Sequence, residues 1–154
     1  MKMLDTSPLV RHIQDWFDEE EPTAEIWVLG SLIRGKPATL PLEAPLSAAR
    51  ELFLEQRIAA IAVVDGNRLI GVVTRTDVLR DGAKPPETTR VADSMSGYVL
   101  AMPAEASIDA AAALMATEQV GQVVVTNTHG DLVGIVSALD IARHVARKAG
   151  YLAG

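Results

Sequence analysis

A seven-residue stretch that occurs twice constrains the fold of this chain more than any other feature. Residues 71–77 read GVVTRTD and residues 134–140 read GIVSALD, 63 positions later (134 − 71). Each copy has a short β-branched run, then a hydroxyl residue, then an acid three positions on, and then an apolar helical pattern. This order predicts a strand that enters a helix through a capping box, in which hydroxyl and acid each bond a backbone N–H of the other residue. The chain therefore contains two copies of one unit.

The similarity between the copies extends upstream of this stretch. Residues 41–53 align with residues 103–115 at an offset of 62, with alanine, leucine, glutamate and proline identities. The one-residue change of offset falls in the predicted turns at 65–68 and 127–131. Length differences between related segments belong in surface loops, so the change supports common ancestry of the elements on either side.

Both copies predict the same order of elements, β-α-β-β-α. We expect these elements at 38–42, about 45–57, 60–64, 69–74 and 78–80 in the first copy, and at 99–102, about 107–119, 122–126, 132–137 and 141–148 in the second. Asp65-Gly66 and Gly130-Asp131 favour hairpin turns with positive φ, so the last two strands of each copy should be antiparallel neighbours. These strands show no polar alternation, which indicates that both faces of each sheet are buried. The sequence predicts an α+β fold in which two units pack sheet to sheet as a pseudo-symmetric pair.

Composition and charge narrow the class of protein. With 154 residues and 49% apolar content, the chain has room for one ordinary domain or for two small ones that share a core, and disorder is not expected. The absence of cysteine excludes disulfides and thiolate metal sites. The charged start does not resemble a secretory signal, and no apolar run approaches the roughly 20 residues of a membrane helix. A net charge of −6 provides no basic field for nucleic acid. We expect a cytoplasmic protein without nucleic-acid or membrane partners.

Residues 1–34 lie outside the repeat and predict an N-terminal helical arm, because apolar residues recur at helical spacing up to an acidic run at 18–21. Residues 25–29 fit a strand or a second short helix. The arm holds three of the six aromatic residues, namely Trp16, Phe17 and Trp27. Two interpretations of these aromatics stay open: they anchor the arm on the main body, or they contact a partner or second copy.

At residues 63–79, VVDGNRLIGVVTRTDVL, the sequence resembles CBS domains, which are named after cystathionine β-synthase. The stretch VADSMS at 91–96 resembles the segment that commonly opens a second CBS domain. The resemblance covers about residues 35–147. It divides the chain into an arm at 1–34, unit 1 at 35–81, a Gly- and Pro-containing linker at 82–90, and unit 2 at 91–149.

The resemblance implies a function as well as a fold. CBS pairs are generally non-catalytic regulatory or sensor modules that form dimers. They bind adenosyl ligands such as AMP, ADP, ATP, S-adenosylmethionine or NAD in clefts between the two units, and they signal occupancy to a partner protein. On this basis we expect a homodimer with a possible adenosyl ligand, no required cofactor, and a regulated partner that the sequence does not identify.

The resemblance also implies site residues in both copies. Asp77 and Asp140 would accept the ribose hydroxyls, since a carboxylate can receive two vicinal O–H donors. Thr74 or Ser137, together with early helix N–H groups, would face the phosphate. The adenine would lie at the starts of the first two strands. Those positions are Thr39, Ala60, Ile61 and Ala62 in the first copy, and Ala101, Gln122, Val123 and Val124 in the second.

The two copies differ between the hydroxyl and the acid. The first has Arg75, a cation suited to pairing with a phosphate, where the second has Ala138-Leu139. If one cleft alone is functional, we expect it at Asp77, or a phosphate-poor adenosine or S-adenosylmethionine type of ligand at Asp140. Both copies lack a proline frequent in the second strand of the family, which leaves an additional backbone N–H at the pocket edge. Ala62 and Val124 stand at that position.

An alternative interpretation of both junctions stays open. A hydroxyl followed by an acid at the third position caps a helix and stabilises its start by about 1 kcal/mol without any ligand. The chain would then be a ligand-free homodimeric interaction module.

The sequence predicts neither a metal site nor catalysis. His12, His129 and His144 lack metal-ligand spacing, and no nucleophile or phosphate-loop motif is present. The cations at the end of the last helix complement its dipole or rim a phosphate cleft; they are Arg143, His144, Arg147 and Lys148.

Overall fold

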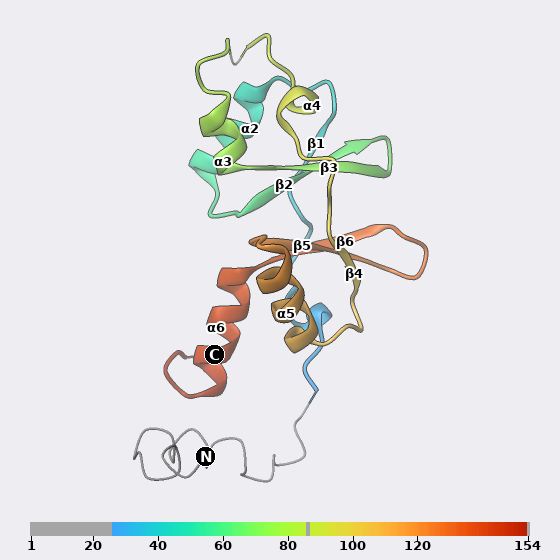
Figure 1. Ribbon diagram of the computed structural model, residues 1–154, viewed down its shortest axis with the longest axis vertical. Coiled ribbons are helices and arrows are strands. Elements are labelled where there is room, and N and C mark those ends of the chain that lie inside the picture. The colour runs from blue at the N-terminus through green and yellow to red at the C-terminus, as the bar shows by residue number, and fades with distance from the viewer. Residues whose placement is uncertain (1–25, 86, 154) are drawn as a thin grey trace, which may run out of the picture.

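The computed structural model describes residues 26–85 and 87–153. Two similar units lie one above the other, and each contains a three-stranded sheet. The two sheets face each other across the middle of the molecule, with the helices on the outer faces (Figure 1). The predicted α+β pair, packed sheet to sheet, is therefore confirmed.

The first unit follows the predicted order of elements. It contains β1 (Thr39–Pro41), α2 (Leu46–Glu55), β2 (Ala60–Asp65), β3 (Arg68–Thr74) and α3 (Arg75–Arg80). β1 is parallel to β2 and β2 is antiparallel to β3, so β2 is the central strand. Gly66, in the turn between β2 and β3, has a φ of 61°, as the predicted hairpin requires.

The second unit repeats this arrangement. It contains α4 (Val91–Ser94), β4 (Ala101–Pro103), α5 (Ile108–Glu118), β5 (Gln122–Thr126), β6 (Leu132–Ser137) and α6 (Ala138–Lys148). β4 is parallel to β5, and β5 is antiparallel to β6. Gly130 has a φ of 80° in the longer turn, where the Asn127 side chain accepts hydrogen bonds from the His129 and Asp131 amides. The longer turn accounts for the change of offset between the repeats.

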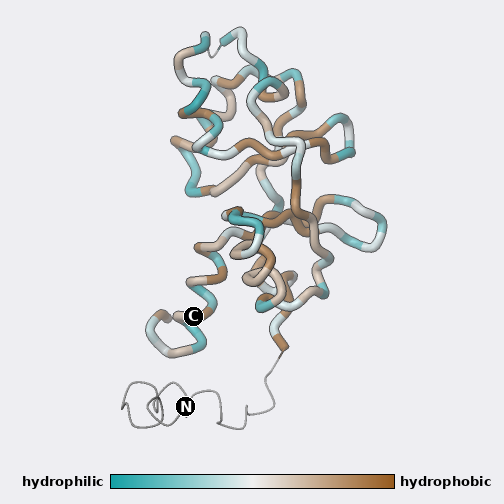
Figure 2. The backbone as a smooth tube through the Cα atoms, in the orientation of Figure 1, coloured by the Kyte–Doolittle hydropathy of each residue, from teal (hydrophilic) through white to brown (hydrophobic). Residues whose placement is uncertain are grey.

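Three buried clusters fill the spaces between the layers. The first joins α2 to its sheet around Leu46 and Ile61, and the second joins α5 to its sheet around Ile108 and Val123. The third lies between the two sheets and contains Ala60, Val72 and Val124. Each central strand is thus buried on both faces, which explains the absence of polar alternation. Figure 2 shows the hydrophobic colours along these strands and hydrophilic colours at the hairpin turns.

The segment that leads into each unit packs against the other unit. Leu29 begins the 3₁₀ helix η1 (Leu29–Leu32) and is fully buried in the core of the second unit. The Leu29 and Gly30 amides donate to the Ala106 and Ala104 carbonyls at 2.9 Å. Conversely, Val91 of α4 is fully buried in the core of the first unit. The two units are therefore joined by these exchanged segments as well as by their sheets.

Residues 26–29, where the sequence left a strand or a short helix open, form neither a regular strand nor an α-helix. Val28 makes a single antiparallel bridge to Ser107, and the 3₁₀ helix η1 follows. The rest of the predicted helical arm, with Trp16 and Phe17, lies outside the described residues. No helix among the described residues combines the length and the apolar content that crossing a bilayer requires.

The glycine that opens each repeated stretch allows a close chain crossing. A Cβ atom at Gly71 would lie 2.6 Å from the Met95 sulfur and 2.8 Å from the Ser96 carbonyl oxygen. A Cβ atom at Gly134 would lie 2.9 Å from side-chain carbons of Ile33. In each case the neighbour belongs to the segment that leads to the other unit. The identity of this glycine in both copies therefore has a packing reason, which the sequence comparison alone did not reveal.

Candidate ligand-binding cleft

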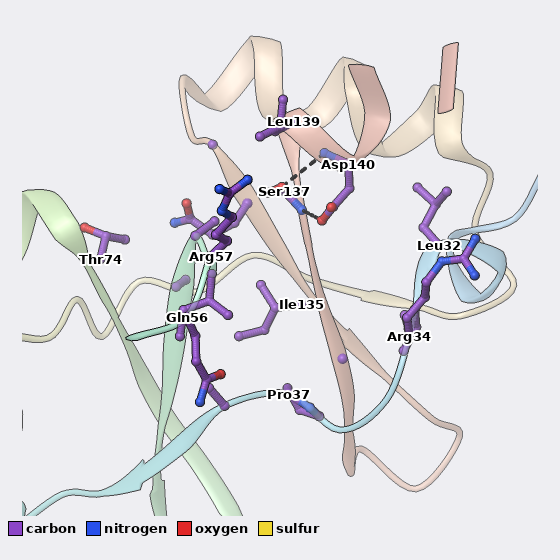
Figure 3. A pocket seen from close by; sticks show the side chains of 18 of the residues that line it. Leu32, Arg34, Pro37, Gln56, Arg57, Thr74, Ile135, Ser137, Leu139 and Asp140 are labelled. Atoms are coloured by element: carbon purple, nitrogen blue, oxygen red, sulfur yellow. Dashed lines mark hydrogen bonds between the residues drawn. The ribbon is translucent and has the colours of Figure 1, made fainter. Parts of the chain in front are cut away.

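A cleft of about 1060 Å³ opens between the two units. Its walls come from residues 32–38 before β1, residues 56–60 before and at the start of β2, residues 74–76 at the start of α3, residues 119–122 before β5, and parts of β6 and α6. The close-up in Figure 3 shows Ile135 and Pro37 on its apolar lining and Ser137 and Asp140 at the start of α6. The volume is that of a small-molecule site.

The structure brings six of the predicted site residues to this cleft and leaves the others outside its lining. Lining residues are Ala60, Thr74, Arg75, Gln122, Ser137 and Asp140. Ile61 and Val123 point instead into the helix-covered cores, and Val124 lies between the sheets. The remaining predicted residues outside the lining are Thr39, Ala62, Ala101 and Asp77. Their binding roles stay predictions. The additional backbone N–H expected at the pocket edge is engaged in both copies, because the Ala62 amide donates to the Ala38 carbonyl at 3.0 Å and the Val124 amide to the Leu100 carbonyl at 2.8 Å.

The first junction forms a closed polar group. Thr74 caps α3: its hydroxyl accepts from the Asp77 amide at 3.3 Å, and its own amide donates to Asp77 Oδ2 at 2.8 Å. The Thr74 hydroxyl also donates to that oxygen at 3.0 Å. The other carboxylate oxygen of Asp77 lies 3.1 Å from an Arg80 nitrogen. Both oxygens of Asp77 are thus engaged, and the residue is only 8% exposed.

The second junction has the same capping box but a more open carboxylate. The Ser137 amide donates to Asp140 Oδ2 at 2.8 Å, and the Asp140 amide donates to the Ser137 hydroxyl at 3.1 Å. The nearest Arg143 nitrogen lies 3.8 Å from Asp140 Oδ1. The side chain of Asp140 is 36% exposed, against 11% for Asp77. Asp140 therefore keeps acceptor capacity toward the cleft.

Helix α6 extends the second junction along the cleft. Asp140, Arg143 and Arg147 follow at positions i, i+3 and i+7, which places them on one face of the helix, and all three line the cleft. The neighbouring face contacts Trp27: the His144 ring centroid lies 5.2 Å from the Trp27 ring centroid, and the Lys148 ammonium lies 4.3 Å from it. Trp27 thus anchors on α6, as one of the two interpretations predicted, while its role in any partner contact stays untested.

Three cations of the cleft were missed by the sequence reasoning. Arg34 and Lys36 lie in the segment before β1, and Arg57 follows α2. The available signal was the placement of cations directly before the first two strands in an otherwise acidic chain. Among the described residues, no group of three or more histidine and acidic side chains is arranged to hold a metal ion.

Comparison with known proteins gives the family of both units. The sequence pattern of the CBS domain matches residues 29–84 and again residues 91–147. Inosine-5'-monophosphate dehydrogenase from Thermoplasma acidophilum is 30% identical over 105 residues, which cover 67% of this chain and 20% of the dehydrogenase. The chain thus corresponds to about a fifth of that enzyme.

Solved structures share the fold. The CBS domain pair of protein MJ0100, in complex with 5'-methylthioadenosine and S-adenosyl-L-methionine, superposes with a TM-score of 0.73 at 22% identity, covering 80% of this chain and 99% of that one. Protein PAE2072 from Pyrobaculum aerophilum, complexed with AMP, gives a TM-score of 0.69 at 22% identity, covering 78% of this chain and 98% of that one. At this level of identity the likeness establishes the fold.

Proposed function

The chain belongs to the CBS-domain family, and on that premise we propose that it is a non-catalytic sensor module that binds an adenosine-containing ligand in the cleft between its two units. Ligand occupancy would be signalled to a partner protein by a cytoplasmic homodimer. The ligand classes are those predicted from the sequence: AMP, ADP, ATP, S-adenosylmethionine and NAD. The binding of AMP by one related structure and of two adenosyl compounds by another supports this choice.

The observation that carries the proposal is the half-buried carboxylate of Asp140, which lines the cleft and keeps acceptor capacity. Its side chain makes one short hydrogen bond, to the Ser137 amide, and one long contact, to Arg143. A carboxylate has about four lone-pair sites, so it can still accept the two vicinal hydroxyls of a ribose. We assign this role to Asp140 rather than to Asp77, whose oxygens are already engaged by Thr74 and Arg80.

The apolar part of the cleft supports the adenine end of the ligand. Ala60, Ile58 and Ala38 from the first unit and Ile135 from the second line the same space. A flat base can enter such a space with little polar desolvation, since small-molecule sites are mostly apolar with a few placed polar groups. Gln122, also in the lining, offers a side-chain amide to the base edge.

Dimerisation is supported by exposed apolar side chains on the outer helices. Leu54 of α2 and Leu79 of α3 are 80% and 81% exposed on the outer side of the first unit. Val145 of α6 and the following Tyr151 are also exposed. Light scattering coupled to size-exclusion chromatography tests dimerisation: a mass of one 16.4 kDa chain at micromolar concentration contradicts the homodimer.

A ligand-free interaction module is the second candidate. The observation that favours it is the complete capping box at both junctions, because each hydroxyl–acid pair then has a role in starting a helix without any ligand. In this case the acids serve stability alone, and the exposed helices dock a partner.

A thermal-shift series separates the two candidates. The pure protein is heated with AMP, ADP, ATP, S-adenosylmethionine, NAD or adenosine, because a ligand that binds only the folded state stabilises it by about 2.7 kcal/mol at 100-fold over its Kd. A selective rise in Tm supports the sensor. The absence of any rise with every compound at millimolar concentration overturns it and favours the interaction module.

A further inference from the structure

The cleft gathers positive charge from a chain that is acidic as a whole. Six of the 12 basic residues in the described part of the chain line it, but only one of the 13 acidic residues there does so, namely Asp140. The basic residues are Arg34, Lys36, Arg57, Arg75, Arg143 and Arg147. The net charge of the protein is −6, so this enrichment is local to the cleft.

Most of these cations lack a carboxylate partner within the described part of the chain. Arg143 is the one cleft cation there with an ion pair, at 3.8 Å from Asp140. Arg75 lies over the Phe53 ring, with 5.5 Å between its guanidinium carbon and the ring centroid. Outside the cleft, Arg80 and Lys84 both lie within 3.5 Å of Asp81. Six cations and one carboxylate around one opening favour the binding of a polyanion.

The backbone at the start of α6 offers little to an anion, so recognition falls to the side chains. The Ala138 amide donates to the Gly121 carbonyl at 2.8 Å, and the Asp140 amide donates to the Ser137 hydroxyl. Two of the first three amides of the helix are therefore already used. Arginine side chains are suited to binding a phosphate here, because the planar guanidinium binds phosphate oxygens in a bidentate manner.

We infer that the ligand of this cleft carries two or more phosphate groups, as in an adenosine di- or triphosphate or a dinucleotide. This inference rests on the proposed function, and it favours the adenosyl ligands with two or more phosphates over AMP and S-adenosylmethionine. Asp140 receives the ribose, and Arg57, Arg143 and Arg147 face the phosphates. S-adenosylmethionine, which carries a sulfonium and an ammonium group, meets repulsion from the same cations. The cleft volume of about 1060 Å³ accommodates a ligand larger than adenosine.

Figure 3 shows that both units contribute side chains to the cleft. Arg57 and Arg34 come from the first unit and its leading segment, while Ser137 and Asp140 come from the second, and all surround the same opening. A polyphosphate bound here bridges the two units. AMP, with one phosphate, would engage fewer of these cations.

The test is isothermal titration calorimetry with ATP, ADP, AMP, S-adenosylmethionine and inorganic tripolyphosphate, in EDTA at low and moderate salt. We expect ATP to bind about tenfold or more tightly than AMP, and S-adenosylmethionine to bind more weakly than AMP. The advantage of ATP should shrink as salt rises, because exposed charges are screened. Arg57→Gln and Arg147→Gln should each weaken ATP about tenfold and AMP less. Arg68→Gln, at an exposed position of the β2–β3 hairpin outside the cleft, is the matched control.

The outcomes separate this inference from the proposed function. Equal affinities for ATP, AMP and S-adenosylmethionine overturn the polyphosphate inference and leave an adenosyl sensor. Binding of tripolyphosphate as tightly as ATP keeps the anion site but overturns the adenosine ligand. If Arg57→Gln and Arg147→Gln both keep the ATP affinity and the Tm of the unmodified protein, then these two arginines do not bind the phosphates and the inference is overturned.

Discussion

The Arg80 guanidinium lies 3.1 Å from Oδ1 of Asp77 and holds that carboxylate against the first unit. The equivalent pair in the second unit, Arg143 and Asp140, is 3.8 Å apart. Both acids have an arginine three residues later, so the difference does not come from local spacing. Arg80 also donates to the Ser94 carbonyl at 3.0 Å, and this bond to the segment leading into the second unit fixes its side chain beside Asp77. The two copies of one motif thus differ in their surroundings: both oxygens of Asp77 are engaged by Thr74 and Arg80, whereas Asp140 lines the cleft.

This difference predicts unequal effects on stability. Asp77→Ala removes a capping box and the Arg80 contact, so it should lower the free energy of unfolding by about 1–2 kcal/mol. Asp140→Ala removes a similar box but only a long and exposed ion contact, and it should cost about 1 kcal/mol or less. Urea denaturation of both variants without ligand measures the two values. A larger loss in Asp140→Ala than in Asp77→Ala contradicts the structural role given to Asp77.

The close approach of Ile33 to Gly134 gives a second prediction. In Gly134→Ala the new methyl group meets three carbons of the Ile33 side chain at 2.9 Å, and overpacking of this kind costs about 1–3 kcal/mol. Ile33→Ala removes those carbons, so the double variant should be less destabilised than the sum of the two single changes. Gly97→Ala is the control, because no heavy atom lies within 4 Å of its added Cβ atom. Strict additivity in this cycle would show that Ile33 does not limit the space at Gly134.

Trp27 should report ligand binding, because α6 contacts it on one face and lines the cleft with the adjacent face. His144 and Lys148 pack on the indole, while Arg143 and Arg147 line the cleft. A ligand that draws Arg143 and Arg147 inward should shift α6 and change the emission of Trp27. The measurement is tryptophan fluorescence in a Trp16→Phe background, which leaves Trp27 as the single tryptophan. Ligand binding seen by calorimetry without any spectral change argues against this coupling.

Much of the fold could be predicted because short local motifs mark the turns and helix starts, and because each motif occurs in both copies. Gly66 and Gly130 marked the hairpins, and Thr74 and Ser137 marked the helix starts. The exchange of leading segments was not predictable, because the few residues around Leu29 show no hydrophobic periodicity that distinguishes a strand from a helix. Their structure depends on carbonyls of the second unit, which lie far along the chain.

The candidate site was predictable only in part for the same reason. The junction acids could be found from a repeated motif, but their exposure depends on partners such as the Ser94 carbonyl beside Arg80. Arg34 and Arg57 lie in loops without any motif. They become neighbours of Asp140 only after the two units have packed together.

The central claim is that Asp140 holds the ribose of an adenosine ligand in the cleft. The most direct test compares the affinities of ATP and 2',3'-dideoxy-ATP in the unmodified protein, in Asp140→Ala and in Asp77→Ala. Hydrogen bonds to a charged group contribute about 1.5–3 kcal/mol, so the unmodified protein should prefer ATP by about tenfold or more. Asp140→Ala should bind both compounds equally, and Asp77→Ala should keep the preference. A preference for ATP that survives in Asp140→Ala but disappears in Asp77→Ala would contradict this account and place the ribose at Asp77.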